Sequence, residues 1–157
     1  MSAVSDGYIK KVRPSLSSRY VQGYIDPSSC RKLFPSLSRE RVIYRSSYEK
    51  KFIYYLENSP SIRRWGSECL EIPYFSAIDQ KMHRYYPDYL VETVGGEVIV
   101  VEVKPLSQTH PPVNENDGWG RREWMKNACK WTAAREWCKE KGFKFKILTE
   151  NTINKLP

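Results

Sequence analysis

Apolar side chains recur at helical spacing in two stretches of the chain. In the range 46–58, they stand at i, i+4, i+7 and i+8 counted from Tyr48, which predicts an amphipathic helix that ends before Pro60. The range 123–141 carries a second apolar stripe, and Gly142 follows it in the position where glycine ends a helix. The pattern therefore predicts two helices separated by about half of the chain.

Short runs rich in Val, Ile, Leu and Tyr predict strands. The predicted strands are 69–74, 84–93, 97–104 and 143–148. The third is apolar on both faces almost to its end, so we expect it in the middle of a sheet with cover on each side. The order helix, three strands, helix, strand predicts one α/β domain, a three-strand meander in a mixed central sheet flanked by helices.

The chain changes character near residue 41. Residues 1–41 contain nine serines and carry eight basic residues against three acids, without apolar periodicity. We therefore predict a basic, Ser/Pro-rich, partly disordered N-terminal arm at 1–41 and a folded domain at 42–157. Two interpretations of the arm stay open, a solvated tail and a segment that lies on nucleic-acid phosphates.

The amino-acid composition reduces the number of possible function classes. Twenty-six Lys and Arg against 18 Asp and Glu give a formal net charge of +8, which is typical of a protein that binds a polyanion such as DNA. There is no apolar run near the roughly 20 residues of a membrane span and no signal peptide, so we expect an intracellular protein without a membrane partner. The four cysteines form no Cys-x-x-Cys pair, which favours a role as small apolar fillers over a zinc site.

The candidate chemistry lies at Pro87-Asp88 and at Glu102-Val103-Lys104. Because strand side chains alternate, Glu102 and Lys104 project from one face of their strand. A hairpin in which residues 88 and 102 are partners would add a second carboxylate to that face. This register requires an odd-length loop, such as a three-residue turn with a left-handed glycine, and we predict that loop at Gly95-Gly96.

Two neighbouring carboxylates repel one another unless a cation lies between them, and oxygen ligands favour Mg²⁺. A lysine beside such an ion can orient water and offset charge on a phosphorus under attack. Each residue also has a structural interpretation, because Glu102 and Lys104 can form an ordinary ion pair and Asp88 can be a turn residue. Charged groups at the end of so apolar a strand nevertheless favour a catalytic role.

These residues resemble a known family. Pro87-Asp88 followed by Glu102-x-Lys104, with an acid in the first helix, resembles the PD-(D/E)XK nuclease superfamily. The strings Val42 to Glu49 and His83 to Asp88 extend the resemblance to the head completion nucleases of large contractile-tailed bacteriophages. The resemblance implies a restriction-endonuclease-like core and a DNA phosphodiester hydrolase.

The resemblance also implies roles for single residues. Asp88 and Glu102 would bind Mg²⁺ or Mn²⁺ together with the Val103 carbonyl, and Lys104 would assist the attacking water. Glu49 matches the acid that steers a water or a second ion. Ser46-x-x-Glu49 is also a capping box, so catalysis and helix capping both remain open for Glu49.

Basic residues beside these positions are candidate DNA contacts. Arg45 and Arg84 adjoin the acids in sequence, and a guanidinium binds two phosphate oxygens at once. Lys130, or Asn127 on the same face of the second helix, can point to the site. Arg121 and Arg122 follow Trp119, a pattern typical of a DNA clamp. Surface solubility is the alternative for each of them.

The implied task is the processing of packaged DNA during phage head completion and head–tail joining, by endonucleolytic or exonucleolytic cuts. The expected partners are DNA and phage head or neck proteins, either in the cytoplasm of the infected host cell or on the virion. Two alternatives remain. One is a nuclease of repair, recombination or transposition, including the endonuclease subunit of heteromeric transposases, and the other is a non-enzymatic virion adaptor.

Overall fold

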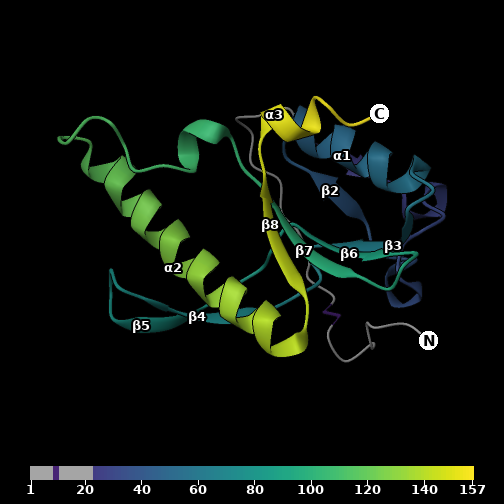
Figure 1. The fold of residues 1–157 in the computed structure, drawn as a ribbon, viewed down its shortest axis with the longest axis horizontal. Helices are drawn as coiled ribbons and strands as arrows, with labels where there is room; N and C mark the ends of the chain where they lie inside the picture. Colours follow the sequence, from purple (N-terminus) through teal and green to yellow (C-terminus); the bar gives the residue numbers. More distant parts are fainter. Residues whose placement is uncertain (1–8, 11–22) are drawn as a thin grey trace.

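A mixed four-stranded sheet forms the centre of the protein. The computed structural model describes residues 9–10 and 23–157 (Figure 1). The sheet has the order β3-β6-β7-β8, in which the first three strands are antiparallel and β8 runs parallel to β7. Its strands are β3 (Ile62–Ser67), β6 (Tyr89–Thr93), β7 (Val98–Val103) and β8 (Lys144–Leu148).

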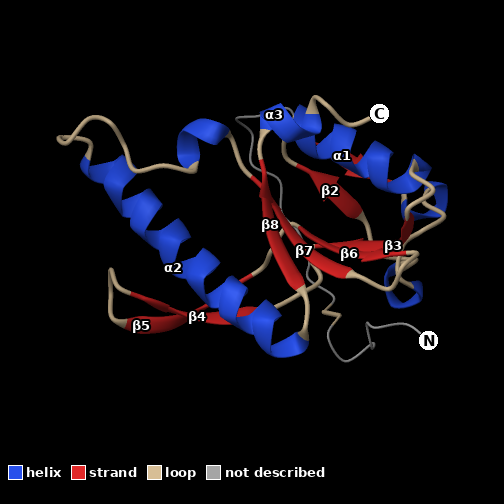
Figure 2. Ribbon diagram, in the orientation of Figure 1, coloured by secondary structure: helices blue, strands red, loops and turns tan. Residues whose placement is uncertain are grey.

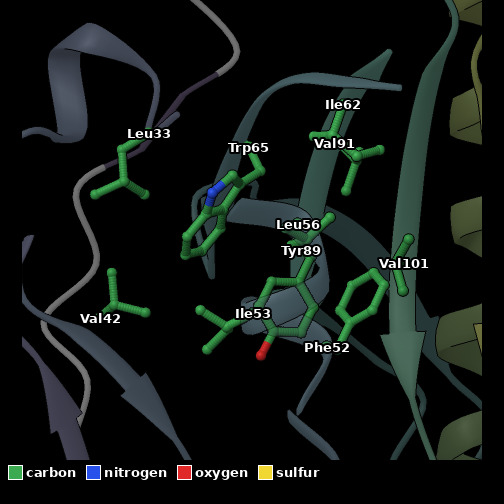
Figure 3. Close-up of a cluster of buried hydrophobic side chains, with 10 residues drawn as sticks. All are labelled: Leu33, Val42, Phe52, Ile53, Leu56, Ile62, Trp65, Tyr89, Val91 and Val101. Carbon is green, nitrogen blue, oxygen red and sulfur yellow. The ribbon is translucent and has the colours of Figure 1, made fainter. Parts of the chain in front are cut away.

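Helix α1 (Ser47–Asn58) covers one face of this sheet. Its residues Phe52, Ile53 and Leu56 pack against side chains from β3, β6 and β7 in a cluster that also contains Leu33 and Val42 (Figure 3). The ring of Phe52 meets Tyr89 edge-on, with centroids 5.1 Å apart. Burial of this apolar stripe is what fixes the helix to the sheet.

Helix α2 (Gly118–Lys141) lies on the other side of the sheet (Figure 1). Cys138 of α2 joins Leu90, Val98 and Val100 in a second buried cluster, which Phe34 and several neighbours complete. Gly142 ends the helix with a φ of +73°, a left-handed conformation that favours glycine. The chain then returns directly into β8.

A two-stranded hairpin is inserted between β3 and β6. Its strands are β4 (Ile72–Ser76) and β5 (Lys81–Tyr85), and it packs along α2 rather than joining the central sheet (Figure 2). A third buried cluster holds hairpin and helix together and consists of Ile72, Tyr74, Tyr85, Trp131 and Ala134. One edge of α2 is therefore fixed by the sheet and another by the hairpin.

The segment 23–41, which we assigned to the N-terminal arm, packs on this domain. Strand β1 (Gly23–Ile25) pairs with β2 (Val42–Tyr44), and two short 3₁₀ turns, η2 (Pro27–Ser29) and η3 (Pro35–Leu37), follow β1. Leu33, Phe34 and Leu37 are buried in the core clusters. The remainder of the arm, apart from residues 9 and 10, lies outside the described residues.

The fold class and both main helices are confirmed. The first helix begins one residue later than predicted because Ser46 is its N-cap and accepts the Glu49 N–H. The second begins five residues earlier than predicted, at Gly118, because the Asp117 side chain caps it by accepting the Gly120 N–H at 2.8 Å. The segment between β7 and α2 contains the turn η4 (Leu106–Gln108).

Two of the strand predictions were wrong in detail. The first strand of the meander is β3, and β4, which overlaps the predicted strand 69–74, belongs to the inserted hairpin. The predicted strand 84–93 is two strands, β5 and β6, because Pro87 has no N–H to donate to a sheet. The other two strands are confirmed, and a short helix, α3 (Glu150–Ile153), follows β8.

The register predicted for the hairpin of β6 and β7 is confirmed. Tyr89 pairs with Val101 and Glu92 with Val98, so each pair of residue numbers adds to 190. The Thr93 N–H donates to the Glu97 carbonyl across a three-residue loop, in which Gly96 has a φ of +88°. That positive φ requires glycine in practice, which is how the sequence sets an odd loop length.

The cysteines are free thiols. Cys69 and Cys138 are buried in the second core cluster, and burial raises the pKa of Cys69 to about 12 and that of Cys138 to about 11. These two therefore act as apolar fillers. Among residues 9–10 and 23–157, no helix combines the length and the apolar character that crossing a bilayer requires.

Candidate active site

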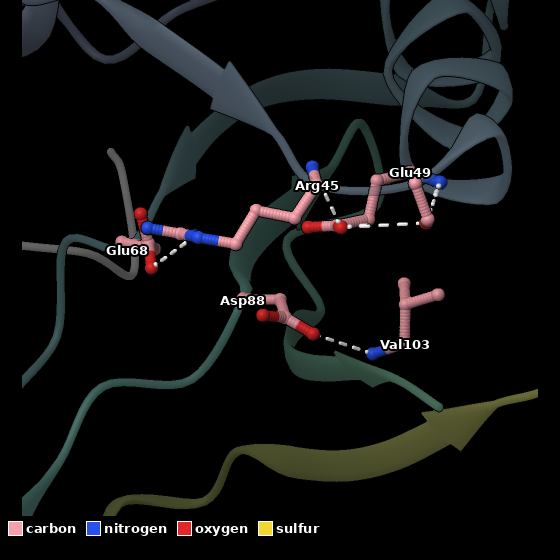
Figure 4. Close-up of polar contacts among 6 residues, drawn as sticks. Arg45, Glu49, Glu68, Asp88 and Val103 are labelled. Atoms are coloured by element: carbon pink, nitrogen blue, oxygen red, sulfur yellow. Dashed lines mark hydrogen bonds and ion pairs between the residues drawn. The ribbon is translucent and has the colours of Figure 1, made fainter. Parts of the chain in front are cut away.

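The candidate site lies where β6 begins and β7 ends. Asp88 directly precedes β6, and the β6–β7 register, extended by one pair, places it opposite Glu102. The Val103 N–H donates to the Asp88 Oδ2 at 2.8 Å, which holds the carboxylate against the end of β7 (Figure 4). The hairpin register thus brings the two acids to one face of the sheet, as the sequence predicted.

Glu102 is buried, and two groups hold its carboxylate. The Tyr85 hydroxyl donates to Oε2 at 2.6 Å, and the Lys104 ammonium lies 4.0 Å from Oε1. Strand alternation accounts for Lys104, because residues 102 and 104 share a face of the chain. Tyr85 comes from the end of β5, so the inserted hairpin supplies one of the contacts of the central carboxylate.

The site concentrates negative charge in a buried space. Burial and the neighbouring carboxylates of Glu102 and Glu49 raise the pKa of Asp88 well above its usual value. Burial also raises the pKa of Glu102, against the opposing effects of Tyr85 and Lys104. Two ionised carboxylates are therefore unfavourable here until a positive charge joins them.

Glu49 lies close enough to contribute to this charge and is also a helix cap. Its Oε2 accepts the Arg45 N–H at 2.9 Å and lies 3.3 Å from the Ser46 hydroxyl, while Ser46 accepts the Glu49 N–H in return (Figure 4). Burial raises the pKa of Glu49, and Glu49 in turn raises that of Asp88. The two interpretations of this residue are thus geometrically compatible.

Arg45 contacts two acids, Glu49 through its backbone N–H and Glu68 through its side chain. Its Nη1 forms an ion pair with Glu68 at 2.7 Å, and Glu68 has a φ of +46°, which is uncommon for a residue other than glycine (Figure 4). The Glu68 N–H donates to the Asp88 carbonyl at 2.9 Å. Glu68 therefore links Arg45 to the backbone of the first candidate catalytic acid.

Comparison with known proteins agrees with this geometry. The sequence model of the TnsA-like endonuclease N-terminal domain matches residues 59–150, which include Asp88, Glu102 and Lys104. The chain is also 35% identical to the head completion nuclease of Enterobacteria phage T4 over 126 residues, covering 74% of this chain and 84% of the relative.

The chain belongs to the TnsA-like endonucleases. These proteins are part of the PD-(D/E)XK, restriction-endonuclease-like superfamily to which the sequence motifs pointed, and the mixed sheet flanked by helices is consistent with that fold. Nuclease activity follows from this membership and from the relative.

The donor atoms of this TnsA-like endonuclease fit a hard divalent cation. Asp88 and Glu102 offer carboxylate oxygens. Burial raises the pKa of both, and the charges of Glu102 and Glu49 raise that of Asp88 further, so a cation would favour the ionised form of each acid. Within the described part of the chain, no three His, Cys, Asp or Glu residues form a ready-made metal cage. A metal here would therefore also need oxygen from the backbone or from water.

Helix α2 turns two polar residues of the endonuclease toward the site. Asn127 is buried on its inner face, and the half-buried Lys130 has its ammonium 5.5 Å from the ring centroid of Tyr85. Burial lowers the pKa of Lys130 and nearby Glu102 raises it. The face of α2 considered from sequence is thus the one that faces the acids.

The remaining basic candidates of the endonuclease lie away from the acids. Arg84 is 70% exposed in side-chain area on β5 and lies 3.4 Å from Glu71. Arg121 and Arg122 are exposed in the first turns of α2, and Arg122 lines a cavity of about 260 Å³ between that helix and the β4–β5 hairpin. Sequence proximity was a poor guide for Arg84 because neighbouring strand residues point to opposite faces.

Two residues of the site were missed from the sequence. Tyr85 and Glu68 hold Glu102 and Arg45 respectively. Strand β5 is exposed from Lys81 to Arg84 and buried only at Tyr85, so no alternation marks Tyr85 as an inward-facing residue until β5 is known to pack on α2. No sequence pattern singles out Glu68, because its role depends on a positive φ at the point where the chain leaves β3 for the inserted hairpin.

Proposed function

We propose that this nuclease hydrolyses DNA phosphodiester bonds with Mg²⁺ or Mn²⁺ bound by Asp88, Glu102 and the Val103 carbonyl. The observation that carries the proposal is the pair of acids held face to face by the β6–β7 register, with Lys104 4.0 Å from Glu102. The net charge of +8 supports DNA as the polyanionic substrate.

The residues of the candidate site have separate parts in the proposed reaction. When bound, the divalent ion supplies a Lewis acid that lowers the cost of negative charge on the phosphate. The Lys104 ammonium orients the attacking water and offsets charge that grows on the phosphate oxygens. Tyr85 keeps the Glu102 carboxylate in one orientation, and Glu49 accepts a hydrogen bond from water on the α1 side of the site.

The proposed DNA contacts divide into two groups by their placement. Lys130 and Arg45 lie at or beside the site and would bind the phosphates next to the cleaved bond. Arg84, Arg121 and Arg122 would bind the backbone farther along. That the basic N-terminal arm also contacts DNA phosphates is a separate proposal. It is tested by deleting residues 1–18, most of which lie outside the described residues, and measuring the salt dependence of DNA binding.

The biological task we propose is head completion, the processing of packaged DNA before phage head and tail join. The relative from phage T4 is named a head completion nuclease, and the similarity extends over most of both chains. The implied partners are phage head or neck proteins, in the infected cell or on the virion. The match to the TnsA-like endonuclease domain favours transposition or recombination as the second candidate.

Incubation of plasmid DNA with and without Mg²⁺ tests the chemistry. Glu102→Ala and Lys104→Ala should each lower the cleavage rate by a factor of about 10² or more, because each removes a group that acts on the reacting phosphate. Glu97→Ala is the matched control, because it removes an exposed acid, just before the same strand, whose carboxylate forms an ion pair with Lys144 at 2.7 Å. Equal cleavage by Glu102→Ala and the wild type would contradict the proposal.

Phage assembly separates the biological alternatives. If the protein completes heads as an enzyme, a phage that carries Glu102→Ala makes heads that do not join tails. A non-enzymatic adaptor would still complement with that variant. A transposition nuclease would leave head–tail joining unaffected when the whole protein is removed.

A further inference from the structure

A cavity of about 340 Å³ opens beside the candidate active site. It lies between the segment that follows β7 and the first half of α2, where the chain arches from η4 to the start of the helix (Figure 1). The side chains that matter for its chemistry are Lys104, Gln108, Asp117, Trp119, Trp124 and Asn127. Its volume is at the lower end of the range of small-ligand sites, about 300–1,000 Å³.

The cavity adjoins the candidate active site at Lys104. Lys104 lines it and also lies 4.0 Å from the Glu102 carboxylate, so one side chain borders both spaces. Asn127, buried on the inner face of α2, lines it as well. A DNA strand with a phosphate at Lys104 would therefore have its adjacent nucleotide at the mouth of this cavity.

The lining favours a nucleobase over a phosphate. The carboxylates of Asp117 and Glu123 border the cavity and would repel a phosphate group, whereas carboxylates accept hydrogen bonds from the amino groups of bases. The amides of Gln108 and Asn127 both donate and accept, which suits the polar edge of a base. Lys104 remains available to the phosphate at the inner end.

Two tryptophans provide apolar surface in the same cavity. Trp124 is fixed by an edge-on contact with the buried Trp131, with ring centroids 6.1 Å apart. Trp119 lines the cavity but is 76% exposed, so its indole is not a core residue. An exposed indole beside polar groups is the kind of surface on which single-stranded nucleic acids stack their bases.

We propose that this cavity binds one unstacked nucleobase of the DNA strand whose phosphate lies at Lys104, with Trp119 as the stacking platform. The inference rests on the proposed DNA hydrolysis and adds a preference for DNA that presents a base outside the double helix. Such a base comes from a single-stranded segment or from a nucleotide drawn out of a duplex.

Binding measured without cleavage tests the proposal. Fluorescence anisotropy of labelled single-stranded DNA, tailed duplex and blunt duplex is followed in EDTA with the full-length protein. Trp119→Ala should weaken binding of the single strand roughly 5- to 150-fold, the loss expected from one stacked base. Trp119→Phe should restore most of it, and Met125→Ala, which removes another exposed apolar side chain from α2 outside the cavity, should leave it unchanged.

The DNA forms distinguish the two sources of the base. A loss confined to the single strand and the tailed duplex identifies single-stranded segments, and a loss that extends to blunt duplex identifies a nucleotide drawn out of the helix. Unchanged binding of all three by Trp119→Ala overturns the proposal. Failure of the wild type to cut plasmid DNA contradicts the proposed hydrolysis, which is a separate measurement.

Discussion

The hydrogen bond from Tyr85 to Glu102 offers a sharp test of how the site is held. Tyr85→Phe removes one hydroxyl and keeps the ring, which is buried against α2 with Ile72, Tyr74 and Trp131. The lost contact is short, 2.6 Å to Oε2, and it leaves Glu102 with Lys104 at 4.0 Å on the other oxygen. The carboxylate then gains freedom to rotate without any change in the fold.

The expected loss follows from the type of bond. A hydrogen bond to a charged group contributes about 1.5–3 kcal/mol, and loss of an outer partner of a metal ligand lowers metal affinity or activity about 10- to 100-fold. We therefore expect the Mg²⁺ concentration for half-maximal cleavage to rise about tenfold or more in Tyr85→Phe. Because the Tyr85 hydroxyl also lowers the pKa of Glu102, its loss should move the acidic limb of the activity profile to higher pH.

Plasmid cleavage measured over a Mg²⁺ titration and over a series of pH values tests the two effects. Tyr86→Phe is the matched control, because it removes the neighbouring hydroxyl, which lies 3.3 Å from Glu71 instead of Glu102. Its Mg²⁺ dependence should equal that of the wild type. The same Mg²⁺ dependence and pH profile in Tyr85→Phe would refute the positioning role of this hydroxyl.

Two predictions concern stability. The Glu57 carboxylate accepts hydrogen bonds from the Arg31 N–H, the Lys32 N–H and the Trp65 Nε1–H at 2.9 to 3.1 Å. Glu57→Ala should therefore lower the free energy of unfolding, measured by urea denaturation, by about 2–4 kcal/mol. An effect no larger than that of Asn58→Ala would contradict this prediction. The Tyr89 hydroxyl is buried and has no hydrogen-bond partner among residues 9–10 and 23–157, so Tyr89→Phe should raise that free energy by about 1 kcal/mol. A measured decrease would show that the hydroxyl is satisfied.

The sequence predicted the parts of the site that depend on local rules. Alternation along β7 places Glu102 and Lys104 on one face, and the left-handed Gly96 fixes the loop length that brings Asp88 opposite Glu102. The end of α2 was also predicted, because Gly142 follows known capping chemistry, whereas the Asp117 cap at its start was missed. These features require only a few neighbouring residues.

The inserted hairpin was not predicted, because its position depends on contacts between distant segments. The strand periodicity of β4 and β5 says that they are strands but not that they pair with one another beside α2. Strand β3 was not predicted because Arg63 and Arg64 interrupt its apolar pattern. In the structure, Arg64 forms an ion pair with the buried Glu92 at 3.0 Å. Tyr85 was therefore not recognisable as a partner of Glu102.

The insertion joins the sheet beside the candidate active site. The chain leaves β3 at Ser67 and returns at Tyr89, and these two residues pair, so the hairpin is added without a change of register. The Glu68 N–H donates to the Asp88 carbonyl where the insertion begins and ends, and the base of the hairpin supplies Tyr85 to Glu102. Both candidate metal ligands are thus held by residues of the inserted segment. Contact of DNA with the exposed face of the hairpin would therefore act directly on the geometry of the two acids.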